Sequence, residues 1–160
     1  MLHRIYRWTI VVLMACLPLG GFAADSGLTT LPSKHSAEET IHQFEAAIRA
    51  GSDQGWIVFT ELDHAAAAKQ NGQELRTRTV IVFGNPRLGT PVLRKAPTVA
   101  IDLPPKALVW QDDQGKVWLT YNSGEYVMDY VYPRHGLPSN AAVAKALDDF
   151  VKHAAEQATE

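Results

Sequence analysis

The sequence is almost without cysteine, because Cys16 is the only one in 160 residues. A single thiol excludes an intrachain disulfide framework and a cysteine-rich zinc module. Positive charge is not in excess either, since 15 Lys and Arg face 17 Asp and Glu for a net charge of −2. That balance argues against an electrostatic nucleic-acid binder, so we expect no nucleic-acid partner. Hydrophobic residues make up 46%, which is enough to build a packed core.

Motifs of the common catalytic classes are also missing from the sequence. It has no G-x-S-x-G nucleophile elbow and no glycine-rich loop followed by lysine and a helix. It has no HxxxH or HExxH pattern that would bring two imidazoles onto one helical face. The sequence therefore names no cofactor, predicts no metal site and leaves open whether the protein is an enzyme.

The first 23 residues have the layout of a secretory signal peptide. Arg4 and Arg7 precede an apolar stretch, residues 8–19, and small residues follow as far as Ala23. The stretch is shorter than the roughly 20 apolar residues that a transmembrane helix needs. We therefore expect cleavage after Ala23, a periplasmic or secreted protein, and no membrane span in the mature chain.

Cys16 offers a less favoured alternative. Residues 13–16 resemble the lipid-attachment box of bacterial lipoproteins, although Met14 fits that box poorly and the apolar stretch continues past the cysteine. In that case the protein would be anchored to a membrane through a lipid on Cys16. With cleavage after Ala23 the mature chain has no thiol and cannot use a cysteine nucleophile.

The remaining chain reads as a linker, residues 24–35, followed by one domain, residues 36–158. Ser36 and Glu39 have the spacing of a capping box, and Gly51 ends the helix that they begin. Asp63 is expected to cap a second, alanine-rich helix that ends at Gly72. Strands are expected at residues 55–62, 76–84, 107–111 and 116–121.

Turn residues set the order of the second half. Residues 112–115, Asp-Asp-Gln-Gly, are a strong hairpin signal between the last two strands. Short helices are expected at residues 90–95 and 123–130, and Ser139 is expected to cap the last helix. The order predicts an α+β fold, with a four-stranded, mainly antiparallel sheet covered on one face by helices.

Several short motifs together resemble one known family. They are Asp63-His64, Phe83-Gly84-Asn85-Pro86, Asp102-Leu103-Pro104, the Gly115 hairpin, Tyr121-Asn122 and Arg134-His135-Gly136-Leu137. Across about residues 38–150 the sequence resembles the domain-of-unknown-function 302 family. The resemblance implies a compact α+β domain that forms a homodimer, and it implies no established activity.

Two histidines are candidates for chemistry. His64 at a helix start and His135 in a loop between prolines could act as general bases or as metal ligands. With Glu61 or Glu125 they could form a two-histidine, one-carboxylate site. The alternative is structural, because Asp63 caps a helix beside His64 and the His135 ring could fix its loop.

Polar residues at strand ends give further candidates. Arg78 and Arg87 could bind a small anion. In the favoured alternative Asn85 bonds its own turn, Pro86 fixes that turn and the arginines are solvated. Tyr121 could donate a hydrogen bond in a pocket or lie in the core. The candidate ligand-binding residues are His64, Asn85, Arg87, Tyr121, Asn122 and His135.

Aromatic residues gather near the hairpin, where Trp110 and Trp118 could share one face in the core, in a dimer interface or in a pocket. Three functions stay open. The favoured one is an exported module that binds a small ligand, either apolar or anionic. The others are a metal- or cofactor-dependent enzyme using His64 and His135, and a structural or assembly protein of the cell envelope.

Overall fold

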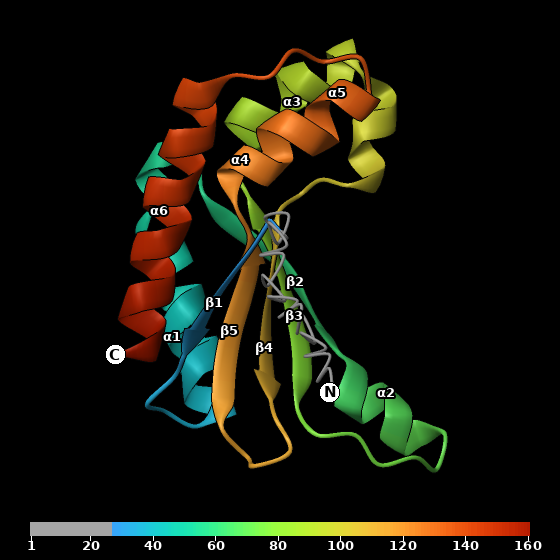
Figure 1. Cartoon of the computed structure of the whole chain (residues 1–160), viewed down its shortest axis with the longest axis vertical. Coiled ribbons are helices and arrows are strands. Elements are labelled where there is room, and N and C mark those ends of the chain that lie inside the picture. The colour runs from blue at the N-terminus through green and yellow to red at the C-terminus, as the bar shows by residue number, and fades with distance from the viewer. Residues whose placement is uncertain (1–26) are drawn as a thin grey trace, which may run out of the picture.

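The computed structural model describes residues 27–160, so the expected signal peptide, its cleavage site and Cys16 lie outside the described residues. Figure 1 shows a sheet with two long helices against one face and a group of shorter helices at one end. The strand order is β1-β5-β4-β3-β2, and every neighbouring pair is antiparallel. The strands are β1 Leu28–Pro32, β2 Ile57–Asp63, β3 Arg78–Gly84, β4 Lys106–Gln111 and β5 Val117–Asn122.

The sheet has five strands rather than the expected four. The additional strand, β1, lies inside residues 24–35, which the sequence pattern assigns to a linker. It pairs with β5 at the edge of the sheet, and Pro32 is tolerated because an edge strand has one side without ladder bonds. The α+β class and the antiparallel sheet are as predicted.

Helices α1, Ala37–Ala50, and α6, Ala141–Thr159, cover one face of the sheet (Figure 1). Alternate strand residues point at them, which gives the core its pattern of buried positions. Phe44 and Phe83 meet edge to face with ring centroids 5.4 Å apart. Fully buried side chains of this core include Phe44, Ile48, Ile81, Phe83, Val109 and Leu119.

Local signals explain where most elements begin. Ser36 Oγ accepts from the Glu39 amide at 3.1 Å, and Asp63 Oδ1 accepts from the Ala65 amide at 2.8 Å. Asp63 thereby begins α2, His64–Gln70. In the β4–β5 hairpin Gly115 has a φ of 80°, the left-handed conformation that favours glycine. These expectations from the sequence are confirmed.

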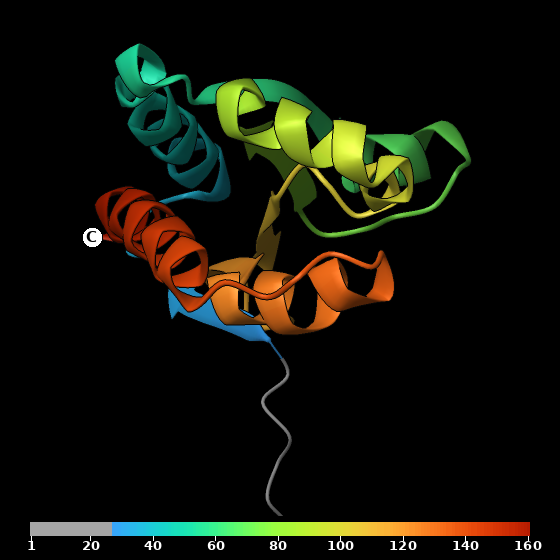
Figure 2. The same cartoon turned by 90° about the horizontal axis from the view of Figure 1, so that it is seen from above.

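Short helices form the end of the molecule that Figure 2 shows from above. They are α3 Pro86–Lys95, η2 Pro97–Ile101, α4 Gly124–Tyr126, the π-helical turn η3 Val127–Val131 and α5 Tyr132–Arg134; a single 3₁₀ turn, η1 Ser52–Gln54, follows α1. Among the described helices, none is long and apolar enough to cross a membrane.

Two helix starts differ from the expectation. Helix α3 begins at Pro86 rather than near Thr90, because Asn85 Oδ1 caps it by accepting from the Arg87 amide at 3.0 Å. Asn140, not Ser139, caps α6, and its Oδ1 accepts from the Ala142 amide at 3.0 Å. The Ser139 hydroxyl instead donates to the Asp129 carboxylate.

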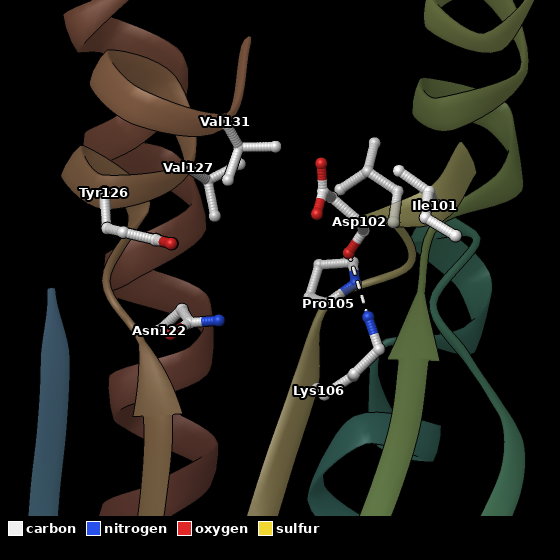
Figure 3. Close-up of a pocket in the computed structure, with 9 residues that line it drawn as sticks. Ile101, Asp102, Pro105, Lys106, Asn122, Tyr126, Val127 and Val131 are labelled. Carbon is white, nitrogen blue, oxygen red and sulfur yellow. Dashed lines mark hydrogen bonds between the residues drawn. The ribbon is translucent and has the colours of Figure 1, made fainter. Parts of the chain in front are cut away.

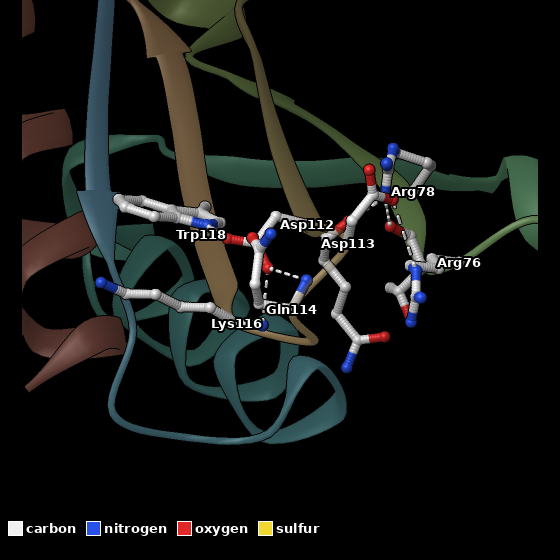
Figure 4. A network of polar contacts seen from close by, with 9 residues as sticks. Arg76, Arg78, Asp112, Asp113, Gln114, Lys116 and Trp118 are labelled. Atoms are coloured by element: carbon white, nitrogen blue, oxygen red, sulfur yellow. Dashed lines mark hydrogen bonds and ion pairs between the residues drawn. The ribbon is translucent and has the colours of Figure 1, made fainter.

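The sheet face opposite α1 and α6, here called the second face, carries half-buried and exposed side chains. Trp110 and Trp118 stack across β4 and β5 with centroids 5.9 Å apart. Arg78 lies 5.5 Å from the Trp110 ring and Lys116 lies 4.3 Å from the Trp118 ring. Figure 4 shows the Asp112 carboxylate with the basic side chains of Arg76, Arg78 and Lys116 at the turn end of the β4–β5 hairpin. Apolar and aromatic members of the second face are Leu62, Val80, Leu108, Trp110 and Trp118.

Candidate functional site

A large cleft lies at the helical end of the sheet. One wall is α3 with η2, and the other is η3 and α5 with the loop that follows and the first turns of α6 (Figure 2). Its floor is built from Gly84 at the end of β3 and from Pro104 and Pro105 before β4. Its volume is about 1270 Å³, above the range of roughly 300–1,000 Å³ common for small-molecule sites.

The lining of the cleft is mostly apolar. Leu88, Val92 and Leu93 come from the first wall, and Met128 and Leu147 come from the second. One end is formed by Trp56 and Phe150, whose rings stack with centroids 3.9 Å apart and an interplanar angle of 9°. Polar side chains that reach the cleft are Gln54, Asn85, Thr90, Lys95, Ser139 and Asn140. Such a lining suits an apolar body with a polar group at its edge.

The residues that form the floor of the cleft are packed closely against one another. A Cβ atom at Gly84 would lie 3.3 Å from the Pro104 Cβ, so a side chain here would crowd the floor. The Phe83 amide donates to the Pro105 carbonyl at 3.1 Å, and Lys106 Nζ donates to the Pro104 carbonyl at 3.0 Å. These contacts fix the segment that joins the first wall to β4.

A contact between His135 and Asp102, here called the clasp, joins the two walls. His135 Nε2 donates to Asp102 Oδ2 at 2.6 Å, and its Nδ1 lies 2.9 Å from Thr98 Oγ1. Thr98 and Asp102 belong to the first wall, and His135 follows α5 in the second. Arg134 Nη1 is 3.6 Å from Asp102 Oδ1. The His135 hydrogen bond holds the pKa of Asp102 below its ordinary value, and the nearby Arg134 charge acts in the same direction.

A smaller pocket of about 140 Å³ lies beside the clasp. Figure 3 shows Asp102 and Lys106 on one side of it and Asn122 and Tyr126 on the other. This volume accommodates only a few water-sized groups. We therefore treat the large cleft as the candidate binding site.

The structure brings only part of the predicted site together. Asn85 lines the cleft while its Nδ2 donates to the Gln54 carbonyl at 3.0 Å. Arg87 Nη1 donates to the Asp53 carbonyl at 3.2 Å and so ties η1 to α3. His135 forms the clasp, and Asn122 lines the smaller pocket.

Tyr121 and His64 lie elsewhere. Tyr121 is 4% exposed and faces the core, where burial raises the pKa of its hydroxyl. His64 begins α2, which lies at the end of the sheet opposite α5 and His135 (Figure 1). The two histidines are therefore not brought together. Within residues 27–160, no three His, Cys, Asp or Glu side chains are grouped closely enough to hold a metal ion.

Sequence reasoning missed the partners of His135 and the apolar side chains of the first wall. Asp102 and His135 both belong to motifs that carry the family resemblance, Asp102-Leu103-Pro104 and Arg134-His135-Gly136-Leu137. That shared membership was the one signal in the sequence that could have paired them. Nothing in the spacing of the two motifs indicated that they meet. Leu88, Val92 and Leu93 fall at helical spacing once the helix is begun at Pro86 instead of Thr90.

Comparison with known families and proteins gives a consistent result. The family described as "Domain of unknown function DUF302" matches residues 29–154. A protein of Brucella suis named "Fluoride-specific ion channel FluC 1" is 42% identical over 120 residues, which are 75% of this chain and 44% of that protein. A protein of the same name from Brucella abortus is also 42% identical, over 42% of its length. The chain thus spans less than half the length of these relatives.

One solved structure resembles this fold closely. It is the crystal structure of an uncharacterized conserved protein DUF302 from Bacillus stearothermophilus, with a TM-score of 0.65. The match covers 83% of this chain and 98% of that one at 16% sequence identity. At that identity the likeness shows the fold alone.

Proposed function

The chain belongs to the DUF302 family, and from that premise and the cleft we propose that it is an exported module that binds a small, largely apolar ligand. The observation that carries the proposal is the apolar lining of a cleft of about 1270 Å³. Apolar surface facing water costs roughly 25 cal/mol per Å², so a ligand that covers this lining gains that free energy.

The polar side chains of the cleft restrict the ligand further. Most of them lie at the ends of helices, since Asn85 caps the start of α3, Lys95 is its last residue, and Asn140 caps the start of α6. A ligand with an apolar body and one polar or anionic end would place that end beside Lys95 or an amide. One ligand would then have both of the properties that the sequence leaves open, an apolar body and an anionic end.

Titration with the apolar dye N-phenyl-1-naphthylamine tests the proposal. We expect its fluorescence to rise on binding and the rise to be lost in Ala146→Trp, which puts an indole into the cleft from exposed α6. Ala67→Trp makes the same change on exposed α2, away from the cleft, and serves as the control. Equal dye binding by both variants would argue against the cleft as the site.

We also propose that the protein pairs with a second copy through the second face. The family resemblance implies a homodimer, and this face presents Leu62, Leu108 and a tryptophan pair on one side of a sheet whose other side is packed. Faces of this kind pack against each other in β-sandwiches. Export would be tested by sequencing the N-terminus of the protein taken from the periplasm, which we expect to start after Ala23.

A second candidate function follows from the Brucella relatives. The described residues provide no membrane-spanning helix, yet they match less than half of proteins named as fluoride channels. The chain could therefore act as an extramembrane partner of a fluoride channel. Deleting its gene would then lower resistance to fluoride, and a channel subunit would copurify with it. A role in assembly of the cell envelope stays a prediction from the sequence.

A further inference from the structure

All ten residues of helix α3 are half-buried or exposed. Leu88 is 66% exposed, and Ile101, at the end of the adjoining η2, is 76% exposed. A helix of this length gains little stability from intrinsic propensity and depends on a covered apolar face. Val92 packs on the buried cluster around Val99 and Leu137. The exposed Leu88 and Ile101 are left for a surface beyond the domain itself.

The same segment carries charge of one sign. Residues 75–101 contain five basic residues and no acidic residue. Three of them, Arg87, Arg94 and Lys95, lie on α3 and are exposed. The next acidic residue, Asp102, is engaged by His135 in the clasp. The first wall thus combines exposed leucine and isoleucine with an excess of positive charge, because these three basic residues outnumber its one carboxylate, Asp102.

The opposite wall adds to this surface at the same end of the molecule. Tyr130 in η3 is 64% exposed and stacks on Tyr126 with centroids 5.6 Å apart. Arg134 in α5 is 59% exposed in its side chain. The exposed carboxylates of Glu125 and Asp129 also lie at this end of the molecule, so the wall adds aromatic and arginine side chains rather than net positive charge. Tyrosine and arginine side chains of this kind are favoured at the boundary between lipid and water.

We propose that α3 and η2 dock onto an anionic lipid surface, with the mouth of the cleft beside the bilayer. Exposed leucine and isoleucine would enter the region between headgroups and acyl chains, while Arg87, Arg94 and Lys95 contact the anionic headgroups. A second copy is disfavoured as the occupant, since two α3 helices would oppose three positive charges on each side. The inference goes beyond ligand binding, although a bilayer would be a natural source of an apolar ligand.

Hydrogen exchange on vesicles tests the docking directly. The protein isolated from cells is mixed with vesicles of equal phosphatidylglycerol and phosphatidylcholine, or of phosphatidylcholine alone. We expect slower exchange in residues 86–101 on the anionic vesicles only, and unchanged exchange in the hairpin at residues 112–115. Because the readout is local, a contribution of the N-terminal residues to binding does not affect it.

Charge reversal gives the matched variants. Arg94→Glu with Lys95→Glu is expected to weaken binding to anionic vesicles by at least about tenfold. Lys69→Glu with Arg76→Glu makes the same change in net charge at the opposite end of the sheet. This control is expected to change vesicle binding less than about twofold. Leu88→Ser should also weaken binding. Because Leu88 is exposed, this variant should melt like the unaltered protein, which thermal melting checks.

Three results would overturn the inference. They are equal vesicle binding by both charge-reversed proteins, equal protection of residues 86–101 by neutral vesicles, and protection that grows with protein concentration without lipid. The last would assign the surface to a second copy. Ala146→Trp, which fills the cleft, is expected to bind vesicles normally, so failure of the ligand proposal would leave this inference standing.

Discussion

His135 and Asp102 are 33 residues apart in sequence, and their side chains meet at 2.6 Å across the two walls of the cleft. The other ring nitrogen of His135, Nδ1, lies 2.9 Å from the Thr98 hydroxyl, so both nitrogens have a partner in the first wall. The His135 side chain is only 7% exposed. The clasp therefore fixes the distance between the two walls. Its loss should lower the stability of the protein and change the shape of the cleft.

Replacing Asp102 should weaken the clasp in a way that depends on pH. Because its pKa is lowered in the folded protein, Asp102 contributes stability above its ordinary pKa, and this contribution is lost as pH falls through the lowered value. Asp102→Asn should thus melt several degrees below the unaltered protein near pH ~6, and the difference should shrink toward pH ~3. Thermal melting followed by circular dichroism measures this.

Asp113→Asn is the control for the clasp, since the Asp113 side chain is 95% exposed in the hairpin. It should melt like the unaltered protein at each pH. A pH-independent deficit in Asp102→Asn would contradict the assigned role of the carboxylate charge.

Two glycines in short helices should respond oppositely to alanine. A Cβ at Gly124 would lie 2.1 Å from the Ala144 carbonyl oxygen, because α4 packs against the backbone of α6. Gly124→Ala should therefore cost about 1–3 kcal/mol of unfolding free energy. At Gly89 in α3 a Cβ meets no atom within 4 Å, so Gly89→Ala should gain up to about 1 kcal/mol from helix propensity.

Chemical denaturation of both glycine variants measures these free energies. If the Gly124 and Gly89 variants were equally stable, the close packing of α4 on α6 would be wrong.

The carboxyl groups of Glu61 and Glu45 interact between β2 and α1. The hydrogen bond with Glu45, followed by burial and the Glu45 charge, raises the pKa of Glu61. The folded state thus binds this proton more tightly, and stability falls as pH rises through the raised pKa. Glu61→Gln should therefore be more stable than the unaltered protein near pH ~7, and this advantage should vanish at acidic pH where Glu61 protonates.

Urea denaturation at several pH values measures the Glu61 effect. Glu74→Gln removes a carboxylate from an exposed loop and should show no such advantage. A loss of stability in Glu61→Gln at neutral pH would contradict the raised pKa.

A charge in the middle of the second face should disrupt the proposed dimer. Leu108 lies on β4 beside Val80 and Thr120 and is half-buried. Leu108→Glu should raise the dimer dissociation constant at least tenfold, because a carboxylate would be desolvated in the interface. Sedimentation measures this, with Leu75→Glu in an exposed loop as the control. A dimer of unchanged strength in Leu108→Glu would place the interface elsewhere.

Much of the fold could be predicted from the sequence because its signals are local. Asp63 and Ser36 cap helices where the pattern predicts them, and Gly115 closes the expected hairpin. The edge strand β1 was missed because five residues with threonines and a terminal proline look like a linker until β5 is present to pair with them. The sequence places the start of α3 too late because Asn85 and Pro86 suit a turn as well as they suit a helix start.

The candidate site was much less predictable. His135 was recognised, but its partner Asp102 depends on how η2 and α5 come together in three dimensions. For Tyr121 the residue type favours the core over a pocket, and the strand register places it there, against the helices. The cleft itself lies between two helical walls that are distant in sequence. No sequence pattern predicts how far apart such segments lie in the folded protein.

Native mass spectrometry of the protein isolated from cells tests the central claim, that the cleft holds a small apolar ligand. We predict a protein peak carrying one small molecule that can be extracted into organic solvent, and we predict that Ala146→Trp lacks it. The account would be contradicted if both proteins, sprayed under equally gentle conditions, showed only the mass of the bare polypeptide.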